Sequence, residues 1–196
     1  MMIIGLTGSV GMGKSLTAAM LRKMGCAVHD ADMAVHRALG PGGAAVDAVA
    51  ALFPQAHIHK AIDRNILGAL VFGQPDKLRQ LEAILHPLVR AAEQEKIARA
   101  RAAGRKTIVL DVPLLFETAG AQRCDATICV TAPAAIQRRR VLSRPGMSAE
   151  KFAQILAAQL PDAEKRRRAD YVVHTGYGRC PAWWQLRWIL WRLGVR

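Results

Sequence analysis

The sequence predicts an α/β protein with three layers, in which helices cover both faces of a parallel central sheet. Short apolar runs typical of buried strands alternate with longer segments whose apolar residues recur at a helical period. Strands separated by helices pair in parallel, because each helical connection returns the chain to the same edge of the sheet. With 196 residues, 52% of them hydrophobic, the chain is long enough for one well-buried domain with a small inserted subdomain.

The first elements follow from apolar runs and their glycine boundaries. Residues 2–7 form an apolar run bounded by Gly8, which predicts a buried strand. A helix is expected from 15 to 24, because Gly25 supplies a C-terminal stop. A short strand at 26–29 comes next, and helices are expected at about 33–39 and 44–52, on either side of a glycine-rich turn.

The segment from 62 to 103 has a helical period throughout and predicts a helical subdomain. Pro75 and Pro87 punctuate this segment, so we expect a helix junction near Pro87 and a long helix from about 87 to 103, ended by Gly104. The expected organisation is a single domain over 1–196. Its core covers about 1–58 and 105–196, and the helical subdomain covers about 59–104.

The last third returns to alternating strands and helices. Strands are expected at 107–112, 126–130 and 171–174, and a basic helix at 134–142. Ser148 is a plausible N-cap for a further helix, and a helix closes the chain. Trp184, Trp188 and Trp191 share one face of that last helix, which favours packing in the core, although a basic aromatic helix also suits a membrane surface.

A phosphate-binding loop follows the first strand. The pattern Gly8-x-x-x-x-Gly13-Lys14-Ser15 has a strand before it and a helix after it, as a P-loop requires. Glycines let the backbone N–H groups approach phosphate oxygens, and the helix directs its positive end at the same anion. Lys14 would reach the β- and γ-phosphates of a nucleoside triphosphate, and the Ser15 hydroxyl would coordinate Mg²⁺. The expected fold is therefore of the P-loop NTPase type, with ATP and Mg²⁺ as cofactors.

The remaining motifs favour a kinase over other users of a nucleoside triphosphate. The N-K-x-D guanine motif of GTPases is absent from the sequence. Asp32 lies just after the second strand, where a carboxylate can accept the proton of an attacking hydroxyl, and Asp30 would support it or cap the next helix. Ile108-Val109-Leu110-Asp111 ends in a carboxylate like the metal-binding strand of a translocating ATPase, which keeps such an ATPase open as an alternative.

Positive charge for the transferring phosphoryl group is expected from a closing lid. Arg140 and Arg144 lie four residues apart on the basic helix and the turn that follows it, so both could face the phosphates. Arg138, Arg139 and the run 166–168 are expected to be solvated surface.

The composition further limits which partners and which cellular compartment are expected. The net charge of +13 favours the binding of polyanions, which are either phosphorylated metabolites or nucleic acid. The four cysteines form no C-x-x-C pair and suit reduced thiols in a cytoplasm. No apolar run approaches the length that spans a bilayer, and the N-terminus resembles neither a signal peptide nor a transit peptide, so neither membrane insertion nor targeting is expected.

Taken together, the motifs resemble the dephospho-coenzyme A kinase family over most of the chain. The segments that carry the resemblance are Leu6-Thr7-Gly8 with the loop, Asp30-Ala31-Asp32, Asp63-Arg64, Leu85-His86-Pro87-Leu88, Val112-Pro113-Leu114-Leu115-Phe116-Glu117, Arg140 with Arg144, Ala158-Gln159 and Ala169-Asp170. The phosphate loop alone is generic, whereas the D-A-D, H-P-L and V-P-L-L-x-E segments in this order are specific.

The resemblance implies transfer of the ATP γ-phosphate to the 3′-hydroxyl of dephospho-coenzyme A, by a core, a helical subdomain that binds the acceptor and a lid at about 137–165. Asp32 is then the catalytic base, helped by Lys14 and by Arg140 on the phosphates. The nucleotide would contact Gly8, Gly11, Met12, Gly13, Lys14, Ser15, Leu16 and Arg144, and the acceptor would contact Asp32, His86, Pro87, Leu114 and Leu115. No nucleic acid partner is expected. The residues alone leave open another small hydroxyl or nucleoside monophosphate acceptor.

Two departures from the family pattern are visible. Leu16 occupies the position where the family usually has Thr, and Thr17 comes one residue later. The segment His174-Thr175-Gly176-Tyr177-Gly178 replaces the usual D-N-x-G after the last strand, which affects a loop expected near the adenine.

Overall fold

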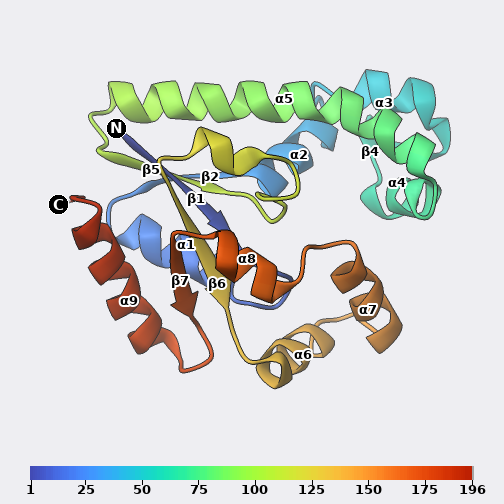
Figure 1. Ribbon diagram of the computed structural model, residues 1–196. Coiled ribbons are helices and arrows are strands. Elements are labelled where there is room, and N and C mark those ends of the chain that lie inside the picture. The colour runs from blue at the N-terminus through green and yellow to red at the C-terminus, as the bar shows by residue number, and fades with distance from the viewer. Residues whose placement is uncertain (196) are drawn as a thin grey trace. The chain divides into compact units, whose positions relative to one another are not determined.

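A computed structural model describes residues 1–195, and these divide into two compact units. The first unit combines Met1–His29 with the chain from Arg99 onward, and the second is Asp30–Ala98. Figure 1 shows that strands and the later helices make up the first unit, and that helices dominate the second.

The sheet of the first unit confirms the α/β expectation. Its strands are β1 (Met2–Thr7), β2 (Ala27–Asp30), β5 (Thr107–Asp111), β6 (Ala126–Thr131) and β7 (Tyr171–His174), in the order β2-β5-β1-β6-β7. Strand β1 pairs in parallel with both β5 and β6, and β6 pairs in parallel with β7. All residues of β5 and β6 are buried, as expected for interior strands of a sheet covered on both faces.

The strand order places the loop after β1 where ligands bind in such sheets. From β1 the chain passes through α1 (Lys14–Lys23) to β2 on one side, whereas β6 and β7 lie on the other side. This reversal makes the carboxyl end of β1 a topological switch point, and open α/β sheets bind their ligands in the crevice there.

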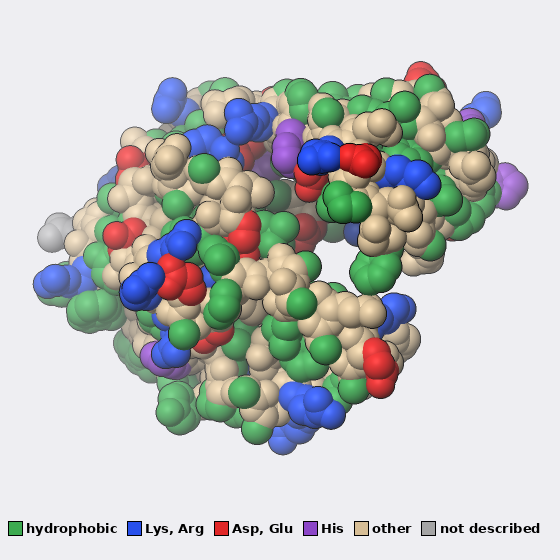
Figure 2. Space-filling view, turned by 45° about the vertical axis from the view of Figure 1, so that its right-hand side comes forward, with side chains coloured by type: hydrophobic (Ala, Val, Ile, Leu, Met, Phe, Trp, Pro, Cys, Tyr) green, Lys and Arg blue, Asp and Glu red, His purple; other side chains and the backbone are tan. Residues whose placement is uncertain are grey.

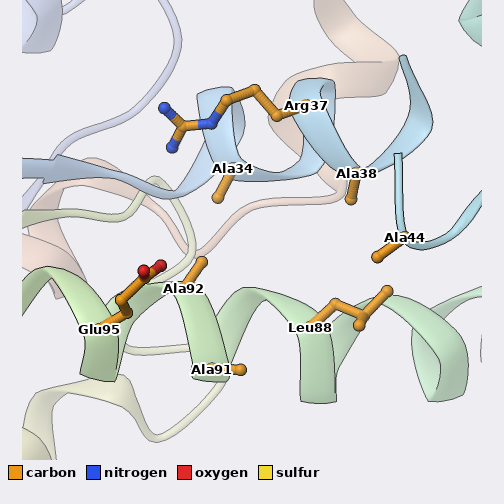
Figure 3. A pocket seen from close by; sticks show the side chains of 8 residues that line it. All are labelled: Ala34, Arg37, Ala38, Ala44, Leu88, Ala91, Ala92 and Glu95. Atoms are coloured by element: carbon orange, nitrogen blue, oxygen red, sulfur yellow. The ribbon is translucent and has the colours of Figure 1, made fainter. Parts of the chain in front are cut away.

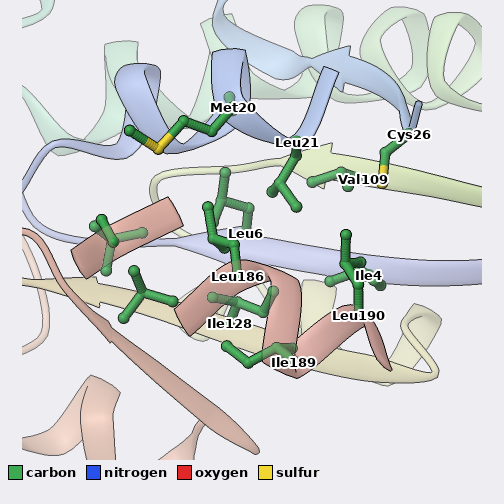
Figure 4. Packing of buried hydrophobic residues seen from close by; sticks show 14 residues of the cluster. Ile4, Leu6, Met20, Leu21, Cys26, Val109, Ile128, Leu186, Ile189 and Leu190 are labelled. Atoms are coloured by element: carbon green, nitrogen blue, oxygen red, sulfur yellow. The ribbon is translucent and has the colours of Figure 1, made fainter. Parts of the chain in front are cut away.

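The remaining helices of the first unit follow β6 and β7. They are α6 (Ala134–Leu142), α7 (Ala149–Ala157), α8 (Asp162–Arg168) and α9 (Arg179–Arg192), and a short 3-10 helix η2 (Gly120–Arg123) precedes β6. Ser148 caps α7 as expected, because its hydroxyl accepts a hydrogen bond from the Lys151 N–H at 3.2 Å. Helices α1 and α9 pack with the sheet around one apolar cluster that includes Ile4, Leu6, Leu21, Ile128 and Leu186 (Figure 4).

The prediction that the tryptophans of the last helix pack in the core is wrong. The buried residues of α9 are Ala182, Leu186, Ile189 and Leu190, whereas Trp184, Trp188 and Trp191 are 61%, 53% and 65% exposed. Both faces of α9 are apolar, so the helical period alone does not say which face meets the sheet. The aliphatic side chains of α9 pack on the sheet, and its three exposed tryptophans lie on the opposite face of the helix.

The second unit is built from four helices and a small hairpin. The helices are α2 (Ala31–Leu39), α3 (Val46–Leu52), α4 (Arg64–Val71) and α5 (Pro75–Ala102), with a 3-10 turn η1 (Pro54–Ala56) and strands β3 (His57–Ile58) and β4 (Ala61–Ile62) between α3 and α4. This unit begins at Asp30, earlier than the expected boundary near residue 59, because α2 and α3 share one apolar cluster with α4 and α5. Leu39, Val49, Leu67 and Leu81 belong to that cluster.

Two local features of the second unit differ from the sequence-based expectation. Pro87 lies inside α5, which is one continuous helix of 28 residues, so no helix junction occurs there. A proline within a helix removes its own backbone donor and crowds the carbonyl four residues earlier, and packing of the residues before and after it offsets this cost. The β3–β4 hairpin was not expected, since its turn residues His59 and Lys60 take left-handed conformations (φ 49° and 61°) without a glycine.

Helix length and the placement of basic side chains are the two surface properties that bear on partners. Among the described residues, no helix combines the length and the apolar composition that crossing a bilayer requires. On the face shown in Figure 2, Lys and Arg side chains stand in several separate groups among apolar and uncharged surface. The high positive charge is therefore distributed over this face rather than gathered in one patch.

Candidate functional site

The loop between β1 and α1 has the geometry of a phosphate cradle. Gly13 occupies the N-cap of α1 with φ 94°, and Gly11 has φ 78°, both in the left-handed region that favours glycine. A Cβ atom added at Gly11 would lie 2.5 Å from a methyl group of Val141, so a larger residue does not fit there. The first N–H groups of α1 remain without helical acceptors and form an anion-binding end.

Lys14 and Asp111 meet beside this loop. The Lys14 Nζ atom lies 2.5 Å from the Asp111 Oδ1 atom, and the two side chains are 14% and 3% exposed. Asp111 ends β5, the direct neighbour of β1, so the parallel pairing brings the carboxylate to the same edge as the loop. Asp111 was not among the predicted site residues, although the apolar run that ends in its carboxylate was the signal.

The other residues of the loop differ in exposure. Ser15 is exposed, and Leu16 is 37% exposed, so both are accessible at the start of α1. Thr17 is fully buried, and its hydroxyl donates a hydrogen bond to the Gly13 carbonyl at 3.2 Å. Thr17 therefore does not substitute for the threonine that the family usually has at position 16.

Side chains from distant segments hold the loop in place. The Gln137 side chain donates a hydrogen bond to the Val10 carbonyl at 2.8 Å, and the Val10 N–H donates one to the Gln159 Oε1 atom at 3.2 Å. Both glutamines thus fix the same residue at the tip of the loop, one from α6 and the other from the segment between α7 and α8. Gln159 lies in one of the segments that carry the family resemblance, but its role as a brace was not expected.

Thr175 links the loop to Arg140. The Thr175 hydroxyl donates to the Met12 carbonyl at 2.7 Å and accepts from the Arg140 Nη1 atom at 2.9 Å, and Arg140 Nη2 donates to the Thr175 carbonyl at 2.8 Å. The altered segment after β7 therefore contacts the phosphate loop directly. Arg140, expected on a lid, is connected to the loop by its hydrogen bonds to Thr175. Arg144 is exposed.

Replacing Thr175 by valine tests this link. The substitution removes one hydroxyl at nearly constant volume, so we expect the dissociation constant for ATP to rise about 5- to 10-fold, equivalent to about 1 kcal/mol. Isothermal titration calorimetry measures this change directly. Thr107→Val is the matched control, because the buried Thr107 hydroxyl has no hydrogen-bond partner and lies at the start of β5. Equal ATP affinity in both variants would contradict the role of Thr175.

The segment after β5 is fastened at both of its ends. The Pro113 carbonyl accepts hydrogen bonds from the Thr7 hydroxyl and from the Lys165 ammonium group, each at 2.9 Å. The same ammonium group pairs with Glu117 at 2.8 Å, and Glu117 also accepts a hydrogen bond from the Leu160 N–H at 3.0 Å. Lys165 is completely buried. Lys165 therefore connects the V-P-L-L-x-E segment to α8, and Thr7 connects it to the end of β1.

The ionised form of Glu117 stabilises the fold. Burial raises the pKa of this carboxyl, but hydrogen bonds from Lys165 and from the Leu160 N–H outweigh burial and hold the pKa below its ordinary value of 4.5. A carboxyl whose pKa is lowered in the folded state contributes stability above the ordinary pKa and loses it as the pH falls through the folded pKa.

Glu117→Gln is expected to lower the free energy of unfolding at pH 7 by about 2 kcal/mol, because it removes the counter-charge of a buried ammonium group. The difference from the unsubstituted protein begins to shrink as the pH falls below 4.5 and is lost as the pH falls through the lower pKa that Glu117 has in the folded state. Urea unfolding at several pH values measures both effects. Glu164→Gln is the control, since Glu164, on the same helix as Lys165, forms surface ion pairs with Arg167 and Arg168 and its loss should leave stability nearly unchanged. A pH-independent difference for Glu117→Gln would contradict this account.

Leu114 and Leu115 lie on this fastened segment with opposite exposures. Leu115 is completely buried, and its side chain occupies the space beside Gly5 and Gly120. Leu114 is 38% exposed. In this conformation Leu114 is the one of the two leucines that is accessible to a ligand.

The remaining predicted site residues lie in the second unit. Asp30 is the N-cap of α2 and accepts a hydrogen bond from the Met33 N–H at 3.0 Å, which leaves Asp32, exposed in the first turn, without that structural task. His86 and Pro87 are exposed on α5. Asp63 caps α4 through its hydrogen bonds to the Asn65 and Ile66 N–H groups, so this part of the family pattern has a structural role.

An open hollow of about 510 Å³ also lies within the second unit. Alanine side chains of α2 and α5 face one another across it, and a leucine and two charged residues complete the lining (Figure 3). The lining consists of Ala34, Arg37, Ala38, Ala44, Leu88, Ala91, Ala92 and Glu95. The hollow combines an apolar floor with one basic and one acidic side chain.

The donor set around the loop fits a magnesium ion that is held mainly by phosphate. Within residues 1–195, no cluster of three or more His, Cys, Asp or Glu side chains could hold a metal ion. Mg²⁺ in nucleotide sites keeps several waters and takes few protein ligands, together with phosphate oxygens. The exposed Ser15 hydroxyl at the start of α1 is suited to such a contact.

Comparison with known proteins agrees with this geometry. A family model described as dephospho-CoA kinase matches residues 2–177. The dephospho-CoA kinase of Rhodospirillum rubrum is 55% identical over 187 residues, covering 95% of this chain and 89% of that protein. That of Mesorhizobium japonicum is 53% identical over 178 residues, covering 91% and 89%. A crystal structure from Thermus thermophilus is 37% identical with a TM-score of 0.87, covering 98% of this chain and 97% of that one. The chain therefore belongs to the dephospho-CoA kinase family.

Proposed function

We propose that this protein transfers the γ-phosphate of ATP to the 3′-hydroxyl of dephospho-coenzyme A and so catalyses the final step of coenzyme A synthesis. The observation that carries the proposal is the phosphate loop with Lys14 held beside Asp111, in a chain that is 53% and 55% identical to two dephospho-CoA kinases over the aligned residues. Phosphoryl transfer requires positioned groups and fixed positive charge more than covalent chemistry, and the loop supplies both.

The ATP side of the reaction belongs to the first unit. The N–H groups of the loop and the start of α1 hold the β- and γ-phosphates, and Lys14 stabilises the charge that develops on them. The nucleotide contacts that we propose are Gly8, Gly11, Met12, Gly13, Lys14, Ser15, Leu16 and Arg144. Ser15 holds Mg²⁺, which, when bound, neutralises phosphate charge and orients the phosphate chain.

The acceptor side centres on Asp32 and the second unit. Asp32 follows β2, a strand of the sheet that also carries the phosphate loop, and its carboxylate accepts the proton of the ribose 3′-hydroxyl as that oxygen attacks the γ-phosphorus. His86 and Pro87 on α5 and Leu114 after β5 contact the acceptor. The hollow between α2 and α5 has the apolar floor that the long pantetheine arm of the acceptor requires.

Segment 137–165 acts as the lid. It contains most of α6 and all of α7, joined by an exposed turn at 143–146 in which Gly146 has φ 73°. Arg140 is already tied to the phosphate loop through Thr175, so its guanidinium group needs little movement to reach a phosphate. Exposed Arg144 approaches when the lid closes and excludes water.

The reaction is expected in the cytoplasm, where thiols stay reduced. All four cysteines are free, and Cys26 and Cys129 are buried. Burial raises the pKa of the Cys129 thiol to about 12, which makes this thiol unreactive at neutral pH.

ADP release with Mg-ATP and a panel of acceptors tests the proposal. Dephospho-coenzyme A, AMP, shikimate and single-stranded DNA are supplied in parallel, and coenzyme A is measured alongside ADP. We expect ADP release only with dephospho-coenzyme A, with an equal amount of coenzyme A. Release with AMP or shikimate instead would assign a different acceptor, and release stimulated by DNA would indicate a nucleic-acid-dependent ATPase.

A further inference from the structure

Helix α9 presents a tryptophan-rich face that the nucleotide site does not use. Trp184, Trp188 and Trp191 are each more than half exposed and follow one another at helical spacing. The opposite face of α9, with Leu186, is buried against the sheet and α1 (Figure 4). The packing of the core is therefore complete without the tryptophans, and their large apolar surface needs another explanation.

The charged side chains of α9 itself are all positive. Arg179, Arg187 and Arg192 of α9 are exposed, and residues 171–195 contain no Asp or Glu. The guanidinium groups of Arg187 and Arg192 lie over the rings of Trp184 and Trp188, each 5.6 Å from the ring centre. Such stacking keeps arginine charge at the same level as the indole rings, so that a partner contacts both together. Tyr177, just before the helix, is 74% exposed.

We propose that the outer face of α9 binds the surface of an anionic lipid bilayer without crossing it. Tryptophan rings prefer the level of the lipid headgroups, where an apolar ring and a polar N–H group are both satisfied, and arginine is attracted by anionic headgroups. A surface helix with aromatic residues on its membrane side and basic residues beside them has the composition of an interfacial helix. The bilayer is the partner that matches both the apolar rings and the unopposed positive charge.

The chain contains its own reporter for this contact. All four tryptophans, Trp183, Trp184, Trp188 and Trp191, lie on α9, so intrinsic tryptophan fluorescence reports on this helix alone. Vesicles of equal parts phosphatidylglycerol and phosphatidylcholine should shift the emission to shorter wavelength and sediment with the protein. Pure phosphatidylcholine vesicles should do neither, and added salt should reverse the binding. Brominated acyl chains in the anionic vesicles should quench the emission.

Two variants test the aromatic and the basic contributions separately. Trp184→Gln with Trp191→Gln removes exposed rings but keeps Trp188, which makes an edge-to-face contact with Tyr171 at 6.3 Å. This variant should lose the vesicle-dependent shift of its remaining tryptophans. Arg187→Gln with Arg192→Gln should lower vesicle affinity on the order of 30-fold. Arg101→Gln with Arg105→Gln is the matched control, because it removes the same net charge at exposed positions outside α9 and should bind vesicles nearly as the unsubstituted protein does.

Binding of a different kind of partner to this face would give different results in the same measurements. Absence of both the shift and the sedimentation with anionic vesicles would overturn the proposal. An equal loss of binding in the arginine variant and its control would also overturn it, since general positive charge would then suffice. An emission shift with single-stranded DNA and none with vesicles would assign the face to nucleic acid. A doubled mass in sedimentation equilibrium that Trp184→Gln with Trp191→Gln abolishes, without vesicle binding, would assign it to a second copy of the chain.

Discussion

Replacing Asp32 by asparagine is expected to lower kcat by about 10²- to 10⁴-fold, the range that a positioned general base contributes. The ATP contacts that we propose are made by the phosphate loop, so the dissociation constant for ATP should stay within about twofold of its original value. Asp30 caps α2, and asparagine at position 32 changes only the charge of an exposed side chain in the first turn, so the fold should be unaffected. Steady-state kinetics with dephospho-coenzyme A and titration calorimetry with ATP measure the two quantities.

Asp47→Asn is the matched control for Asp32. Asp47 is also an exposed carboxylate in the first turn of a helix of the second unit, in this case α3. The control should keep kcat within about twofold, because surface substitutions away from a site have small effects. Near-normal turnover in Asp32→Asn, or an equal loss in both variants, would remove Asp32 from the proton-transfer role.

The second large effect is expected from Lys14→Met, which removes the ammonium group that we propose acts on the phosphates while keeping most of the apolar side chain. We expect kcat to fall by about 10²- to 10³-fold, comparable to the loss of one preorganised charge-stabilising group. The dissociation constant for ATP should also rise, since in the proposed role Lys14 contacts phosphate in the ground state as well as in the transition state. Single-turnover kinetics at saturating ATP separates the two effects.

Lys14→Met also removes an ion pair from a carboxylate that is only 3% exposed, so part of its effect concerns stability. Asp111→Asn in the same chain removes the negative charge together with the positive one, and this double variant should recover stability but not turnover. Lys23→Met, at the exposed far end of α1, controls for the loss of a lysine from the same helix. Recovery of turnover in the double variant would mean that Lys14 serves only to neutralise Asp111.

Most of the fold could be predicted from local patterns in the sequence. The β1 strand, the glycine-rich loop and α1 follow one another within residues 2–23, so their geometry depends on neighbours in sequence and could be predicted. Helix α6 begins and ends where expected, and the Ser148 cap of α7 is confirmed. These features rest on apolar period, glycine and capping residues, which act over a few residues.

The features that were missed depend on contacts between distant segments. The Lys14–Asp111 pair joins residues 97 positions apart, and Thr175 donates to the Met12 carbonyl across 163 positions. These contacts depend on the order of the strands in the sheet, and that order cannot be predicted from a single sequence. The orientation of α9 was mispredicted for the same reason, because only the sheet decides which of two apolar faces is covered. Likewise, the packing around Pro87, rather than the proline itself, decides that α5 continues.

The most direct test of the central claim is the identity of the product that the purified protein makes from Mg-ATP and dephospho-coenzyme A. Phosphorus NMR of the reaction mixture follows the phosphate from the γ position of ATP to the acceptor. The account predicts one new phosphomonoester on the ribose 3′-oxygen for each ADP formed, with the product identical to authentic coenzyme A. Formation of ADP with free inorganic phosphate, or of a phosphomonoester at another position, would contradict it.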